Sequence, residues 1–188
     1  YLFGQGPNGD VIRTYPYSTD MNINPHTYDN IKTEAVPHGV GSVWCAMLWE
    51  MTWALIDDYG FDPDIYNGAS GNNIALSLVV EGLRLQPCSP GFVDGRDAIL
   101  LADRELYGGA HQCLIWEAFA KRGLGYSANQ GSSFSRSDGT QAFDVPSDTA
   151  AFVAPNDVCL SHPILNGLGG GTPIGGVYSG PGVTDDGN

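Results

Sequence analysis

The sequence predicts a mainly α-helical fold, preceded by an irregular segment and followed by a Gly-rich, β-like tail. Three observations support this fold class. Residues 37–60 form the longest apolar run in the chain, and its apolar side chains recur every three or four residues, as on one face of a helix. Further stretches with this period lie between turn residues within positions 74–122. After Tyr126 the composition changes to Ser, Asn, Gln, Gly, Asp and Thr, which is typical of loops.

The first predicted helix is apolar nearly all round. Pro37 stands ahead of its first residue and Gly60 follows its last, as is usual at helix starts and ends. In its middle, only Glu50 and Thr52 are polar. Such a helix is buried inside a helical domain rather than laid on a surface. We expect the remaining helices to pack around it.

Three shorter helices are predicted from caps and glycines that flank apolar periods. They span residues 74–85, capped by Asn72 or Asn73; residues 90–107, opened by Ser89-Pro90 and stopped by Gly108-Gly109; and residues 110–122, followed by Gly123. Four helices joined by short loops form a compact bundle. Residues 1–37 are expected to wrap this bundle without long regular structure.

Composition divides the chain into three parts. Residues 1–126 form the helical domain, residues 127–155 a linker or loop, and residues 156–188 an incomplete β-sandwich-like repeat. The last assignment depends on the weak alternation at Val177-Tyr178-Ser179 among glycines. Because the chain opens on Tyr1 rather than Met, we expect it to be a piece of a longer precursor.

The charge balance excludes some partners. The chain has 21 acidic and 8 basic residues, for a formal net charge of −13. This charge disfavours nucleic acid and anionic membranes as partners. No apolar run reaches the roughly 18 uncharged residues of a membrane span. The low charge content and 26 glycines favour a secreted protein.

The four cysteines form no CxxC pair, which argues against a zinc knuckle or a thioredoxin-type motif. Cys45 lies in the apolar helix and is expected to act as a small hydrophobe. Cys88 and Cys113 flank the third predicted helix and could pair in an oxidising compartment, but their spacing alone leaves this open. No partner is indicated for Cys159.

An acidic loop follows the first predicted helix. Its oxygens could collect calcium, but no EF-hand spacing is present, and ordinary loop and cap chemistry is favoured. The side chains concerned are Asp57, Asp58, Asp62, Asp64 and Asn67.

Two further side chains are candidates for function. His38 stands at the start of the buried helix, where it could either serve a functional site or cap the helix backbone. Arg13 is one of few basic residues, and its forked donors could anchor a carboxylate of the fold or hold a substrate carbonyl or carboxylate. The residues themselves leave both alternatives open.

Four stretches, taken in order, resemble the C-terminal half of the catalytic domain of fungalysin-type metallopeptidases, which are relatives of thermolysin. They are IRTYPYSTDMNINPHTY (12–28), HGVGSVWCAMLWEMTWALID (38–57), LVVEGLRLQPCSPGFVDGRDAILLADRELYGG (78–109) and HQCLIWEAFAKRGLG (111–125). The final GLGGGTPIGGVYSGPGVTDDGN looks like the beginning of the β-sandwich repeats that secreted Bacteroidetes-type proteins carry after their enzyme domains.

The resemblance implies a secreted zinc endopeptidase that acts on proteins or peptides. In this family an HExxH motif and a later Glu bind the zinc, and the Glu of the motif is the general base. Histidine occurs here only at positions 26, 38, 111 and 162, and none begins an HExxH. The zinc ligands of the complete enzyme would therefore lie outside this chain, in the missing N-terminal half. That half would be its partner, and the chain alone would be inactive.

The resemblance also implies roles for individual residues. His38 matches the histidine that donates a hydrogen bond to the developing oxyanion, and Glu34 would orient it. Arg13 corresponds to an arginine that holds the substrate carbonyl. Cys88 and Cys113 would form a disulfide. The alternative is a non-catalytic extracellular binding or adhesion module on the same helical scaffold.

Overall fold

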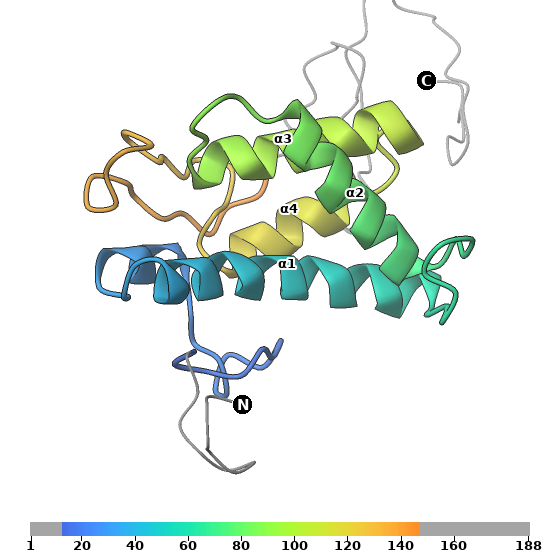
Figure 1. Ribbon diagram of the computed structural model, residues 1–188, viewed down its shortest axis with the longest axis horizontal. Coiled ribbons are helices and arrows are strands. Elements are labelled where there is room, and N and C mark those ends of the chain that lie inside the picture. The colour runs from blue at the N-terminus through green and yellow to red at the C-terminus, as the bar shows by residue number, and fades with distance from the viewer. Residues whose placement is uncertain (1–12, 147–188) are drawn as a thin grey trace, which may run out of the picture.

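The computed structural model describes residues 13–146, and these form a helical bundle (Figure 1). Its elements are η1, a 3-10 helix at Tyr28–Lys32, and the α-helices α1 (His38–Tyr59), α2 (Gly71–Leu85), α3 (Phe92–Tyr107) and α4 (Gln112–Lys121). Within residues 13–146 the only β-pairing is two isolated bridges. The predicted mainly α fold class is confirmed. The predicted β-like repeat at 156–188 lies outside the described residues.

Helix α1 is the element on which the others pack. It runs along one side of the bundle, with α4, α2 and α3 stacked on the other side (Figure 1). One face of α1 supplies Val43, Met47, Met51 and Leu55, none of which is exposed. These side chains meet apolar residues of the other helices, among them Leu78, Ile99, Ile115 and Phe119. Truncating such a side chain to Ala typically costs about 2–5 kcal/mol.

The N-terminus of α2 lies three residues earlier than predicted. Ser70 precedes the helix, and its backbone N–H donates to Oδ1 of Asn73 at 3.2 Å. Gly71 follows, at a close approach to α1, where a Cβ atom would lie 2.1 Å from the backbone oxygen of Leu55. Only glycine fits this helix crossing.

Helices α3 and α4 end where glycine predicts. Gly108 and Gly123 have φ values of 64° and 80°, in the left-handed region that glycine tolerates best. The start of α3 lies slightly later than predicted, because Gly91 rather than Ser89 precedes its first residue. The carboxylate of Asp94 then accepts the backbone N–H of Gly91 at 2.9 Å.

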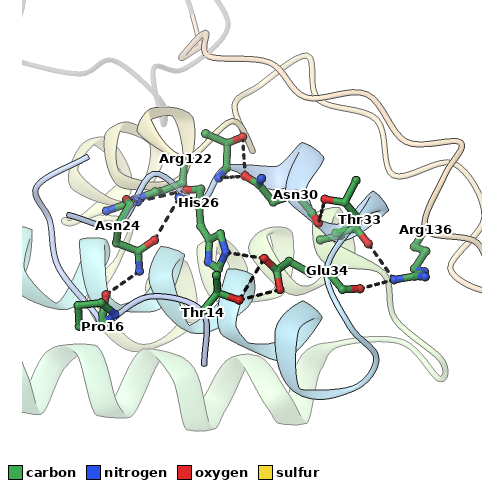
Figure 2. A network of polar contacts seen from close by, with 11 residues as sticks. Thr14, Pro16, Asn24, His26, Asn30, Thr33, Glu34, Arg122 and Arg136 are labelled. Carbon is green, nitrogen blue, oxygen red and sulfur yellow. Dashed lines mark hydrogen bonds and ion pairs between the residues drawn. The ribbon is translucent and has the colours of Figure 1, made fainter. Parts of the chain in front are cut away.

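A buried arginine holds the irregular segment that precedes α1. Arg122 follows α4 and is 0% exposed. Its Nε donates to Glu50 at 2.9 Å, and one terminal nitrogen donates to the backbone carbonyl of Ser18. The other terminal nitrogen donates to the backbone carbonyls of Asn24 and His26 (Figure 2). One guanidinium therefore ties residues 18–26 to both α1 and α4.

The described part of the predicted 127–155 linker packs against the helical bundle. The bridges Leu124–Ala142 and Asn129–Thr140 fold it back on itself. Arg136 then donates to the backbone carbonyl of Glu34, just before α1. The divisions at residues 126 and 155 remain predictions, and residues 147–155 lie outside the described part.

The predicted disulfide between Cys88 and Cys113 is wrong. Both thiols are free in the structure, as is that of Cys45. Cys88 precedes α3, whereas Cys113 lies in the first turn of α4, beyond the other end of α3. Sixteen helical residues span about 24 Å, while a disulfide needs Cα atoms within about 7 Å. Cys159 lies outside the described residues.

A buried carboxylate organises the corner between α3 and α4. Asp103 accepts hydrogen bonds from Nδ1 of His111 at 2.6 Å, from Nε2 of Gln112 at 2.9 Å and from the backbone N–H of His111 at 3.0 Å. Burial raises the pKa of Asp103, but these hydrogen bonds outweigh burial, and the pKa lies below its ordinary value. The rings of Tyr59 and Tyr107 pack edge-on around His111.

Candidate functional site

His38 is the first residue of α1, and its side chain is exposed. The start of α1 has no side-chain cap, and the imidazole of His38 makes no hydrogen bond within residues 13–146. The alternative that this ring caps its own helix is thus without a supporting hydrogen bond in this part of the chain. Both ring nitrogens are available for an external partner.

The structure pairs Glu34 with His26 and Thr14 rather than with His38. Nε2 of His26 lies 3.1 Å from Oε1 of Glu34, and Oγ1 of Thr14 donates to Oε2 at 3.2 Å (Figure 2). The same carboxylate lies over the first turn of α1, where a Cβ atom at Gly39 would come within 2.4 Å of Oε2. Glu34 therefore joins the irregular segment to the start of α1.

His26 is a residue that sequence reasoning missed. It is fully buried, and its ring packs edge-on against Tyr15 at a centroid distance of 5.0 Å. With Nε2 protonated, the ring donates to Glu34, and Nδ1 is left buried without a partner in residues 13–146. Nothing in the local sequence indicates this contact, because eight positions separate the two residues and both lie in irregular chain, on either side of η1.

Arg13 is half-buried at the beginning of the described chain. No carboxylate of residues 13–146 pairs with it, and its Nη1 is buried without a hydrogen-bond partner there. Within residues 13–146 there is thus no carboxylate that Arg13 anchors, as one of its two alternatives requires. Its neighbour Thr14 and the neighbour of His38, Gly39, both contact Glu34. One carboxylate thus bonds the neighbour of Arg13 and lies close to the neighbour of His38.

Comparison with known proteins decides the family. The family model described as fungalysin metallopeptidase (M36) matches residues 2–128. The chain belongs to the fungalysin metallopeptidase family. The match ends well before residue 156, so the resemblance of the tail to a β-sandwich repeat remains a prediction.

Curated fungal relatives agree with the family match. Extracellular metalloproteinase 3 of Arthroderma otae is 48% identical over 123 residues, covering 62% of this chain and 19% of that protein. Extracellular metalloproteinase MEP of Neosartorya fischeri is 49% identical over 127 residues, covering 64% and 20%. Extracellular metalloproteinase 2 of Phaeosphaeria nodorum is 44% identical over 152 residues, covering 77% and 23%. The chain spans about a fifth of the length of these relatives.

Within residues 13–146, this fungalysin chain offers no cluster of side chains that would hold zinc. No HExxH is present in the sequence, and residues 13–146 contain no group of three or more His, Cys, Asp or Glu side chains that could hold a metal. The loop considered for calcium uses its carboxylates internally. Asp62 accepts the N–H of Asp64, and Asp64 accepts those of Tyr66 and Asn67. The hydrogen bonds from Asn67 lower the pKa of Asp64.

Helix α1 also passes a length-and-composition test for a membrane span. Its best 18-residue window has a mean hydropathy of 1.2, and core helices of soluble proteins pass the same test. In this structure one face of α1 forms the centre of the hydrophobic core.

Proposed function

We propose that this chain is the C-terminal, helical part of the catalytic domain of a secreted zinc-dependent endopeptidase. The observation that carries the proposal is the fungalysin match over residues 2–128, which includes an exposed histidine at the start of the central helix. The names of the relatives, extracellular metalloproteinases, support both secretion and peptide-bond hydrolysis.

His38 is the oxyanion donor in this proposal. A carbonyl attacked by water develops negative charge on its oxygen, and an N–H donor aimed at that oxygen stabilises the transition state more than the ground state. Loss of one such donor elsewhere costs about 3–4 kcal/mol. The imidazole of His38 suits this role because it is exposed and spends no hydrogen bond on residues 13–146.

Arg13 is the proposed contact to a substrate carbonyl. A guanidinium presents several donors in a rigid plane, which suits a fixed carbonyl acceptor. Its Nη1 has no partner within residues 13–146. Glu34 does not touch His38, so we assign to Glu34 a supporting role: it holds the backbone beside Arg13 and His38 through Thr14 and Gly39.

The zinc and its ligands belong, in this proposal, to the N-terminal half of the domain, which is the partner of this chain. Zinc would supply Lewis-acid chemistry at the substrate carbonyl, and no residue described here is assigned to it. The contribution of this chain is the opposite wall of the cleft, which binds and orients the protein or peptide substrate.

The test compares the purified 188-residue chain with the full-length protein that contains it. We expect chelator-sensitive hydrolysis of a peptide substrate and stoichiometric zinc in the full-length protein, and neither in the chain alone. Chelator-sensitive activity of the chain alone would contradict the proposal. A full-length protein that lacks both zinc and activity would instead favour the non-catalytic binding module.

A further inference from the structure

The irregular chain that leads into α1 is held at one carboxylate. Glu34 stands four residues before His38, between η1 and α1. Its Oε1 lies 3.1 Å from Nε2 of His26, and its Oε2 accepts the hydroxyl of Thr14 at 3.2 Å (Figure 2). An ionised carboxylate only accepts hydrogen bonds. Nε2 of His26 therefore carries a proton and donates it to Glu34.

His26 is itself held firmly against the bundle. Its backbone N–H donates to Oδ1 of Asn24 at 3.1 Å, and its backbone carbonyl accepts Nη1 of Arg122 at 3.2 Å. Its ring is 1% exposed and packs edge-on against Tyr15. Because the backbone is bonded on both sides and the ring is enclosed, His26 presents a fixed donor to the carboxylate of Glu34.

Backbone hydrogen bonds connect Glu34 to the residue that follows His38. The carbonyl of Ala35, next to Glu34, accepts the N–H of Gly39 at 2.7 Å and that of Val40 at 3.2 Å. The side chain of Glu34 also lies against this first turn of α1, since a Cβ atom at Gly39 would come within 2.4 Å of its Oε2. A shift of Glu34 would therefore move the start of α1.

The imidazole of His26 is a poor choice for packing alone. Its Nδ1 is buried and has no hydrogen-bond partner within residues 13–146. An unpaired polar atom in the interior costs free energy, and an apolar ring of similar size would fill the same space without that cost. What histidine adds at this position is the hydrogen bond from Nε2 to Glu34.

We propose that His26 is a positioning residue of the fungalysin site: through Glu34 it holds the first turn of α1, and with it the exposed imidazole of His38. The inference rests on the proposed function, because it takes His38 to be the oxyanion donor. In this role His26 does not touch the substrate. It keeps the donor at the place where negative charge develops, and a misplacement of about 1 Å in such a group can cost roughly 10²-fold in rate.

Three substitutions in the full-length protein test the role of the Nε2 donor. His26→Phe removes the donor and keeps a ring against Tyr15. His26→Asn is a polar alternative whose amide lies one bond short of Nε2, and it replaces His26→Phe if that variant does not fold. His26→Gln keeps a donor, because its amide nitrogen lies the same number of bonds from the backbone as Nε2.

We expect kcat to fall about 10–100-fold in His26→Phe and His26→Asn, with little change in KM or zinc content, and His26→Gln to retain most of the turnover. Unchanged kcat in the first two variants would overturn the proposal, and so would a loss in His26→Gln as large as theirs. A raised KM with unchanged kcat would assign the effect to the substrate contact at Arg13 and overturn it as well.

Combining His26→Phe with His38→Ala tests whether His26 acts through His38. The double variant should lose no more kcat than His38→Ala alone, because coupled residues are not additive. Losses that multiply would overturn the proposal. Unchanged kcat in His38→Ala would reject the proposed role of His38 and this inference with it. A large loss in His38→Ala beside silent His26 variants would reject this inference alone, so the two failures are distinguishable.

Hydrogen–deuterium exchange read by mass spectrometry follows the same variants without reference to activity. Peptides that cover residues 34–41 should exchange several-fold faster in His26→Phe than in the unchanged protein or in His26→Gln, while peptides from α2 stay the same. Lys32→Met is the matched control, since it breaks a nearby ion pair with Asp29 that is partly exposed. Unchanged exchange at residues 34–41, or an equal rise in α2, would contradict the proposal.

Discussion

Replacing Arg122 should weaken the packing of the irregular segment on the helical bundle and destabilise the fold. Its guanidinium is completely buried, pairs with Glu50, and donates to the carbonyls of Ser18, Asn24 and His26. In Arg122→Leu the carboxylate of Glu50 remains buried with Lys121 as its one ion-pair partner within residues 13–146, and the three carbonyls lose a charged donor. Residues 18–26 then keep the hydrogen bond from Lys121 to the Thr19 carbonyl and the contact of His26 with Glu34.

The expected cost is large because one partner of a buried ion pair is removed while the other remains. Such changes cost about 3–5 kcal/mol, and each hydrogen bond from a charged donor is worth roughly 1.5–3 kcal/mol before non-additivity. For a protein of this size the loss corresponds to a Tm lowered by about 10 °C or more. It would be measured by urea and thermal unfolding of the 188-residue chain.

Lys121→Met is the matched control. Lys121 bonds the same carboxylate of Glu50, but its side chain is 44% exposed, and exposed ion pairs are worth about 1 kcal/mol or less. We therefore expect Arg122→Leu to destabilise far more than Lys121→Met. The free energies of unfolding of the two variants are compared. If they differ by less than about 1 kcal/mol, the size of a surface ion pair, Arg122 does not hold residues 18–26 to α1 and α4 as described.

Two other predictions concern pH and glycine. The pKa of Asp103 is lowered in the fold, so its carboxylate stabilises the fold above the unfolded-state value of about 4 and this contribution is lost as pH falls through the lower folded-state value. Asp103→Asn should therefore lower the free energy of unfolding at neutral pH, and this free energy should fall less steeply on acidification than in the unchanged protein. Urea unfolding at several pH values measures both, and an unchanged dependence on pH would contradict the prediction. Gly71→Ala should destabilise the fold through a clash of the new Cβ atom with the Leu55 carbonyl. Gly41→Ala places its Cβ atom where no atom lies within 4 Å, so it should raise the free energy of unfolding by the helix-propensity difference of about 1 kcal/mol, and raise the Tm with it. Similar melting temperatures for the two glycine variants would count against the helix crossing described here.

The helices could be predicted because the apolar repeat along a helix and the Pro and Gly residues at its ends are properties of the local sequence. Pro37 and Gly60 bound α1 as expected, and Gly108 ends α3 in the left-handed conformation. The sequence predicts too late a start for α2 because Asn73 resembles an N-cap residue. In the structure Asn73 lies inside the helix, and its side chain accepts a hydrogen bond from the backbone N–H of Ser70. Ser70 and Asn73 are both common N-cap residues, so the sequence alone does not show which of them precedes the helix.

Tertiary contacts were not predictable in the same way. The disulfide prediction came from the family resemblance, and it failed because the length of α3 separates Cys88 from Cys113. The pairing of Glu34 with His26 joins two irregular stretches, for which no periodic pattern exists. His38 and Arg13 were candidates from their position and charge, whereas their specific roles come from the family resemblance and remain proposals.

The central claim, that His38 is the oxyanion donor of a fungalysin-type cleft, is tested most directly by kinetics of His38→Ala in the full-length protein. The account predicts that kcat falls roughly 10²–10³-fold, with a smaller change in KM and little change in zinc content or Tm. Val36→Ala, at a neighbouring exposed position, should leave turnover unchanged. An unchanged kcat in His38→Ala with stability lowered by about 1 kcal/mol would contradict the claim and make His38 a helix cap.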